Sequence, residues 1–103
     1  NRFGFFINFI NAVSPACDCY AYNDAPIVRD IGILASTDPV AIDQASVDLV
    51  NREAALPHTC LQANTNTGED KFKGIYPNVE WRLQLDYAEQ IGLGSKNYEL
   101  RSI

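Results

Sequence analysis

The residues best suited to chemistry are two cysteines in one short loop. Cys17 and Cys19 are separated by a single residue in the sequence Cys-Asp-Cys. Two thiolates at this spacing can bind one soft metal ion or close into a disulfide. A tetrahedral zinc ion or an iron–sulfur cluster normally takes four protein ligands, so the pair is only part of a site. We therefore predict Cys17 and Cys19 as metal or redox contacts, and two reduced loop thiols are the simpler alternative.

The remaining soft ligands of the chain are His58 and Cys60. If the loop that carries them folds back, they complete a four-ligand set with Cys17 and Cys19, although such sites usually have Cys-x2-Cys spacing. A long polar loop loses entropy when it is ordered, so we favour ligands that a partner supplies. A nucleophilic pair of His58 and Cys60 is a weaker hypothesis, because near neighbours in the chain rarely reach that geometry. A surface histidine is the simpler interpretation.

Asp38 and Pro39 mark the start of a helix. The carboxylate of Asp38 can accept backbone N–H groups as the N-cap, and Pro39 loses nothing at the first helical position by lacking an N–H. Ser36 and Thr37 could receive an anion at this end, because free N–H groups point there. The chain has no glycine-rich phosphate motif to strengthen that idea.

Two apolar strands and two helices must position these residues. Near-continuous apolar runs predict buried strands at 3–10 and 31–35, and apolar residues at helical spacing predict helices at 39–53 and 78–91. Residues 56–74 are rich in Asn, Thr, Gly and Asp, which predicts a long irregular loop. The tail 98–103 is a candidate for a last short strand.

This order of elements predicts an α/β or α+β fold, in which a small sheet of two to four strands packs against two main helices. A length of 103 residues favours a single module over 1–103. The chain begins at Asn1 and contains no methionine, so we expect a fragment or a cut-out domain of a larger protein.

Composition narrows the function classes. Charged residues make up 20% of the chain and the net charge is -5, which favours a globular protein that binds neither nucleic acid nor an anionic membrane surface. No apolar run approaches the roughly 20 residues of a membrane helix. Three cysteines, an odd number, fit poorly with a secreted disulfide framework, so we predict a cytoplasmic location.

Four stretches of the chain are distinctive when taken together: FINF at 6–9, SPACDC at 14–19, IVRDIGILAS at 27–36 and DPVAIDQAS at 38–46. They resemble the domain of unknown function 362 family, whose longer members often carry bacterial-type ferredoxin motifs. The most distinctive tract runs from Asp30 to Ser46, and the helix near 81–94 resembles the end of the family more loosely.

The resemblance implies that this chain is the carboxyl-terminal segment of a larger protein. It also implies an iron–sulfur cluster in that full-length parent. The motif Cys-x2-Cys-x2-Cys-x3-Cys-Pro is absent from this chain, so no cofactor is expected in this segment. We therefore expect a non-catalytic segment of a ferredoxin-like redox protein, whose partners are cluster-bearing or amino-terminal domains of the same protein. Two alternatives stay open: part of an enzyme active site that a missing amino-terminal region completes, and a zinc-stabilised binding module.

Overall fold

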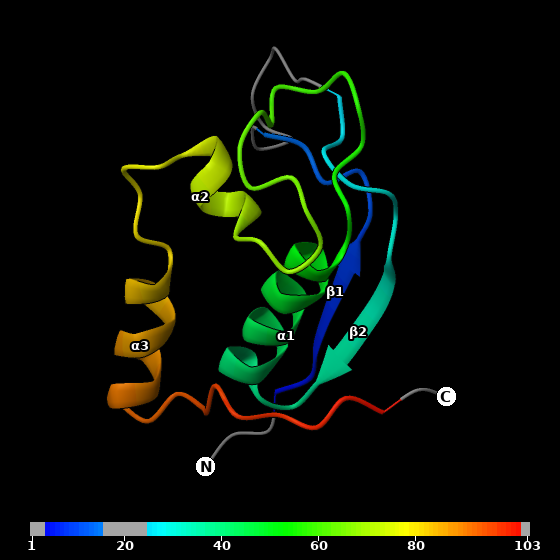
Figure 1. The fold of residues 1–103 in the computed structure, drawn as a ribbon. Coiled ribbons are helices and arrows are strands. Elements are labelled where there is room, and N and C mark those ends of the chain that lie inside the picture. The colour runs from blue at the N-terminus through cyan, green and yellow to red at the C-terminus, as the bar shows by residue number, and fades with distance from the viewer. Residues whose placement is uncertain (1–3, 16–24, 102–103) are drawn as a thin grey trace.

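Two strands and three helices make up the described part of the chain. The computed structural model describes residues 4–15 and 25–101. Its elements are, in chain order, β1 (Phe6–Ile10), β2 (Gly32–Ser36), α1 (Pro39–Arg52), α2 (Lys71–Ile75) and α3 (Arg82–Gln90) (Figure 1). The predicted α/β class is confirmed, and both predicted apolar runs contain a strand.

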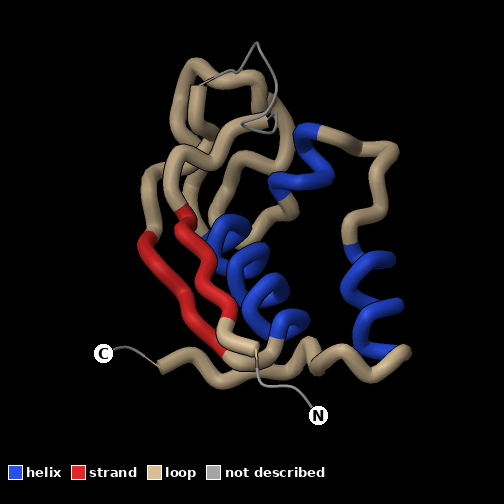
Figure 2. Tube along the Cα trace, turned by 180° about the vertical axis from the view of Figure 1, so that it is seen from behind, coloured by secondary structure: helices blue, strands red, loops and turns tan. Residues whose placement is uncertain are grey.

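The strands β1 and β2 form an antiparallel ribbon. Phe6 pairs with Ser36 at one end and Ile10 with Gly32 at the other. The two strands lie side by side along α1 (Figure 2). In the described part of the chain neither strand pairs with a third one. A two-stranded ribbon is marginal in water by itself, so its packing against α1 is essential to the fold.

Asn8 shows which face of the ribbon α1 covers. Its Nδ2 donates to Oδ1 of Asp43 at 3.1 Å and to Oγ of Ser46 at 2.9 Å, and both acceptors belong to α1. Because side chains alternate along a strand, Ile7 and Phe9 point to the opposite face. That face is left uncovered by α1.

The hydrophobic core lies where the end of β1, the last turns of α1 and two connecting segments meet. Val28 is fully buried there. Partly buried side chains such as Leu49, Phe72 and Ile75 pack against it. The buried cluster consists of Ile10, Ile27, Val28, Val50 and Leu61.

The predicted start of α1 is confirmed, and its capping residue Asp38 also binds the carboxyl-terminal tail. Oδ1 of Asp38 accepts the N–H groups of Val40 at 2.9 Å and Ala41 at 3.0 Å. Oδ2 of the same carboxylate accepts the N–H of Ser95 at 3.0 Å, so the cap also fixes the carboxyl-terminal tail. A Cβ at Gly94 would overlap the Asp38 carboxylate, and only glycine permits this approach.

Three boundaries differ from the sequence prediction. Residues 71–75 form α2 at the end of the predicted irregular loop, because Oδ1 of Asp70 caps the N–H of Lys73 at 3.0 Å. Helix α3 begins at Arg82 rather than near residue 78, after a turn closed by the N–H of Val79 and the oxygen of Tyr76 at 3.0 Å. Residues 98–101 form no strand.

The described helices are short. The longest, α1, has 14 residues, and none in the part of the chain that the structure describes has the length and apolarity to cross a bilayer.

Candidate functional site at the thiol-bearing end of the fold

The predicted metal ligands Cys17 and Cys19 lie outside the described residues. The described chain stops at Pro15 and resumes at Ala25. The described residues on either side show how the chain enters and leaves the segment that carries both thiols.

Backbone hydrogen bonds join the chain that enters this segment to the chain that leaves it. The N–H of Ile27 donates to the oxygen of Val13 at 2.8 Å, and the N–H of Ile31 donates to the oxygen of Ile10 at 2.8 Å. Ile27 retains only 4% of its surface exposed. These bonds hold the outgoing and returning chains side by side on a buried apolar support. We call this arrangement the loop base.

The segment that carries His58 and Cys60 starts at the same loop base. The N–H of Leu56 donates to the oxygen of Ile27 at 2.8 Å, and the hydroxyl of Tyr76 donates to the oxygen of Pro15 at 2.7 Å. Figure 1 shows these segments at the same end of the molecule, away from both termini. The sequence suggested a fold-back of this polar loop, and the backbone places its starting point beside the loop base.

His58 and Cys60 are both exposed, and Cys60 is a free thiol. His58 has a φ of 61°, an uncommon backbone conformation for a residue with a side chain. Within residues 4–15 and 25–101, no group of three or more His, Cys, Asp or Glu side chains could hold a metal ion. These two residues therefore make no metal site by themselves.

A buried lysine binds the carboxyl-terminal part of this loop to α1. Lys71 is fully buried, and its Nζ donates to the backbone oxygens of Asn51 at 2.9 Å, Asn66 at 3.0 Å and Glu69 at 3.4 Å. The ammonium thus lies at the carboxyl end of α1, where the helix dipole favours a cation. Burial lowers the pKa of Lys71, against the opposing effect of Glu69 and Glu53.

Asp70 organises the neighbouring α2 and α3. Besides capping α2, its carboxylate accepts the indole N–H of Trp81 at 3.0 Å and pairs with Arg82 at 3.3 Å. The Arg82 guanidinium lies 4.5 Å from the Trp81 ring centroid, a cation–π contact. Sequence reasoning missed both Lys71 and Asp70. The bonds from Lys71 to Asn51 and from Trp81 to Asp70 span 20 and 11 residues and have no local signal, whereas the cap of Lys73 by Asp70 is a local signal that could have been found.

A polar hollow of about 340 Å³ lies between α1 and α3. Its two carboxylates are already bonded to donors of the chain, since Asp70 is held as above and Asp48 accepts from Gln44 at 2.9 Å. The described residues that line it include no histidine and no cysteine. They are Gln44, Asp48, Asn51, Arg52, Gly68, Asp70, Trp81 and Arg82.

Residues 2–48 match the model of a family described as Domain of unknown function (DUF362). Over these residues, slightly less than half of its length, the chain is similar to the DUF362 family. The predicted resemblance is therefore confirmed over β1, β2 and most of α1, and Cys17 and Cys19 fall inside the matched range. His58, Cys60 and Lys71 fall outside it. No curated protein and no solved structure matches the chain.

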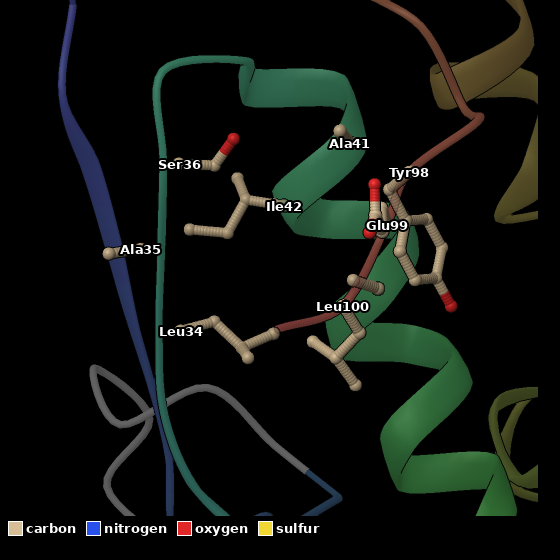
Figure 3. Close-up of a pocket in the computed structure, with 9 residues that line it drawn as sticks. Leu34, Ala35, Ser36, Ala41, Ile42, Tyr98, Glu99 and Leu100 are labelled. Atoms are coloured by element: carbon tan, nitrogen blue, oxygen red, sulfur yellow. The ribbon is translucent and has the colours of Figure 1, made fainter. Parts of the chain in front are cut away.

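The tail closes a small pocket over the DUF362 segment. Side chains from β2, α1 and residues 98–100 surround a cavity of about 70 Å³ (Figure 3). That volume holds about two water molecules, far less than the several hundred Å³ of typical ligand sites. We interpret this pocket as an imperfection of packing between Leu34, Ile42 and Leu100 rather than as a substrate site.

Tyr98 fastens this tail to α1. Its hydroxyl donates to Oδ2 of Asp48 at 2.6 Å. Burial, the hydrogen bond and the charge of Asp48 raise the pKa of Tyr98 from 10.0 to about 12. Because the folded-state pKa is the higher one, the contribution of this contact to stability is complete below pH 10.0 and is lost as the pH rises through about 12.

We expect tyrosinate absorbance to show one component that titrates near pH 12 and is absent from Tyr98→Phe. Asp48→Asn should move that component back toward pH 10, because the neutral amide no longer disfavours the phenolate. Glu80→Gln, at an exposed position whose ion pairs are with Lys73 and Arg82 rather than with the tail, is the control and should leave the titration unchanged. A wild-type protein whose tyrosines all titrate near pH 10 would contradict the assigned contact.

Proposed function

We propose that this chain is a non-catalytic segment of a ferredoxin-like iron–sulfur redox protein, in which Cys17 and Cys19 contact a metal ion or a redox partner. The observation that carries the proposal is the loop base. The 2.8 Å hydrogen bond from the N–H of Ile27 to the oxygen of Val13 joins the chain before the segment that contains both thiols to the chain after it. A metal or redox contact works best when its ligands depart from a rigid support.

Partner-supplied ligands follow from the chemistry of the thiol pair. Two thiolates fill half of a tetrahedral or cluster site, so a neighbouring unit has to supply the rest. We propose that this unit is a cluster-bearing or amino-terminal domain of the same protein, docked at the loop base. A reducing cytoplasm, which keeps both thiols available, is part of the same proposal.

A zinc-stabilised module is the second candidate. The bond from Leu56 to Ile27 supports it, because it starts the segment with His58 and Cys60 at the loop base. In this case the four ligands are Cys17, Cys19, His58 and Cys60, and the isolated chain binds one zinc ion. In the first proposal the isolated chain binds none tightly.

Alkylation of the thiols separates these possibilities. Cys60 is exposed and serves as the internal reference for the reaction rate. In the isolated chain without metal we expect Cys17 and Cys19 to react at rates comparable to that of Cys60. In the full-length protein we expect them to react at least tenfold more slowly, while Cys60 keeps its rate, a factor that corresponds to about 1.4 kcal/mol of protection.

Two outcomes contradict the first proposal. Equal relative rates in the isolated chain and in the full-length protein would leave the cysteine loop as an ordinary structural turn. Zinc-dependent protection of Cys17, Cys19 and Cys60 together in the isolated chain would replace it with the zinc-stabilised module.

A further inference from the structure

The face of the sheet opposite α1 is apolar and exposed. Phe5, Ile7, Phe9 and Ile33 keep 69%, 52%, 66% and 64% of their surfaces exposed. Ala35 on β2 pairs with Ile7 and lies on the same face of the sheet. None of these residues carries a charge. We call these five residues the open sheet face.

The composition of the strands indicates that this face has an occupant. Strands with near-continuous apolar sequence are normally buried on both sides, whereas strands with one wet face alternate apolar and polar residues. β1 reads FINFI, and its polar residue Asn8 points toward α1 rather than toward solvent. In a strand with one solvated face the polar residues point to solvent, whereas in β1 the polar residue points inward and the apolar residues Ile7 and Phe9 point outward.

We propose that a second copy of this chain covers the open sheet face, with the two ribbons stacked about a two-fold axis. A two-fold interface places the same patch on both sides, so the patch must complement itself in charge and in shape. The charge condition is met within the open sheet face, because all five of its residues are uncharged. Stacking this face therefore brings no like charges into contact.

The shape condition follows from the register of the strands. Ile7 and Phe9 form a ridge of large side chains along β1, which Phe5 extends just before the strand begins, and the paired position on β2 opposite Ile7 is the small residue Ala35. In a two-fold stack a large side chain from the ridge of one copy can lie over the low position at Ala35 of the other. Stacked sheets pack about 10 Å apart through this kind of interdigitation.

The available area fits a weak dimer. Four large apolar side chains that are at least half exposed present on the order of 400 Å² per copy. With the rim, a symmetric stack buries about 1,000 Å² in total, the lower limit for a specific interface. We therefore expect dissociation in the micromolar range.

Analytical ultracentrifugation across the micromolar range tests the proposal. The wild-type chain should show a concentration-dependent monomer–dimer equilibrium. Ile33→Lys should weaken it by about 100-fold or more, since the two-fold axis places two new ammonium groups in an apolar interface. Phe9→Ser, which adds no charge, should weaken it by about tenfold or more.

Leu83→Lys is the matched control. Leu83 on α3 is 65% exposed, against 64% for Ile33, and it lies outside the open sheet face. It should leave the dimerisation constant unchanged, with circular dichroism confirming that each variant is folded. A wild-type chain that stays monomeric throughout, or a Leu83→Lys variant as impaired as Ile33→Lys, would overturn the proposal. The first of these results would assign the open sheet face to a different protein or domain.

Discussion

Lys71→Met is expected to lower the free energy of unfolding by about 2–4 kcal/mol, because it removes three charge-assisted hydrogen bonds in the interior, although the oxygens of Asn51 and Asn66 keep the N–H groups of Gly68 and Glu69 as donors. The ammonium of Lys71 binds the oxygens of Asn51, Asn66 and Glu69, which belong to α1 and to the loop before α2. Methionine fills a similar volume, so the change removes the charge and the hydrogen bonds with little loss of packing.

Lys73→Met is the control for that experiment. Lys73 lies two residues further along α2, and its Nζ pairs with the partly exposed Glu80 at 2.9 Å. Solvent screens such a surface pair, so we expect this variant to unfold almost as the wild type does. Urea denaturation followed by circular dichroism measures both changes. Equal, small effects at the two positions would show that the buried ammonium does not fix the loop.

Gly74→Ala is expected to lower the free energy of unfolding by about 2–3 kcal/mol through overpacking. A Cβ at this position would overlap the backbone oxygen of Ala63 and lie 2.7 Å from Cδ1 of Leu61. Leu61 is 5% exposed and belongs to the core, and a backbone oxygen cannot rotate away. Alanine favours the helical backbone by about 1 kcal/mol, so the steric effect must exceed that gain.

Gly68→Ala separates steric overlap from backbone strain. Gly68 has a φ of +87° and open space around its Cα, so alanine there meets no neighbour and only the unfavourable backbone conformation contributes. We expect a loss of about 1–2 kcal/mol. A Gly74→Ala variant that is more stable than Gly68→Ala would show that the loop at Ala63 yields easily, contrary to the proposed close packing against α2.

Local signals explain which elements could be predicted from the sequence. The start of α1 follows from Asp38 and Pro39, and both the cap and the boundary agree with the structure. The strands follow from their apolar runs. The start of α3 was placed four residues too early, because a local turn from Tyr76 to Val79 precedes the helix and the bond from Trp81 to Asp70 spans 11 residues.

The carboxyl-terminal tail also shows that local sequence signals miss long-range contacts. Residues 98–101 have suitable composition for a strand, yet Ser95 and Tyr98 bind side chains of α1 at Asp38 and Asp48. Those partners lie 57 and 50 residues away in sequence, so no local pattern could reveal them.

The candidate site also has features that the sequence predicts and features that it does not. Its residue types, the thiols and the single histidine, could be identified from the sequence alone. The loop base could not, since it depends on pairing between Val13 and Ile27 and between Ile27 and Leu56. Lys71 was also out of reach, because lysine is almost never fully buried and nothing in its flanking residues predicts burial.

The most direct test of the central claim is the alkylation rate of Cys17 and Cys19, relative to Cys60, in the anaerobically purified full-length protein before and after chelation of its metal. The account predicts slow reaction at Cys17 and Cys19 before chelation and a return toward the Cys60 rate afterwards, together with a change in the visible absorption spectrum. Cys60 should react equally in both samples because it is exposed. Relative rates that do not change when the metal is removed would contradict a metal contact at the thiol-bearing end of the fold.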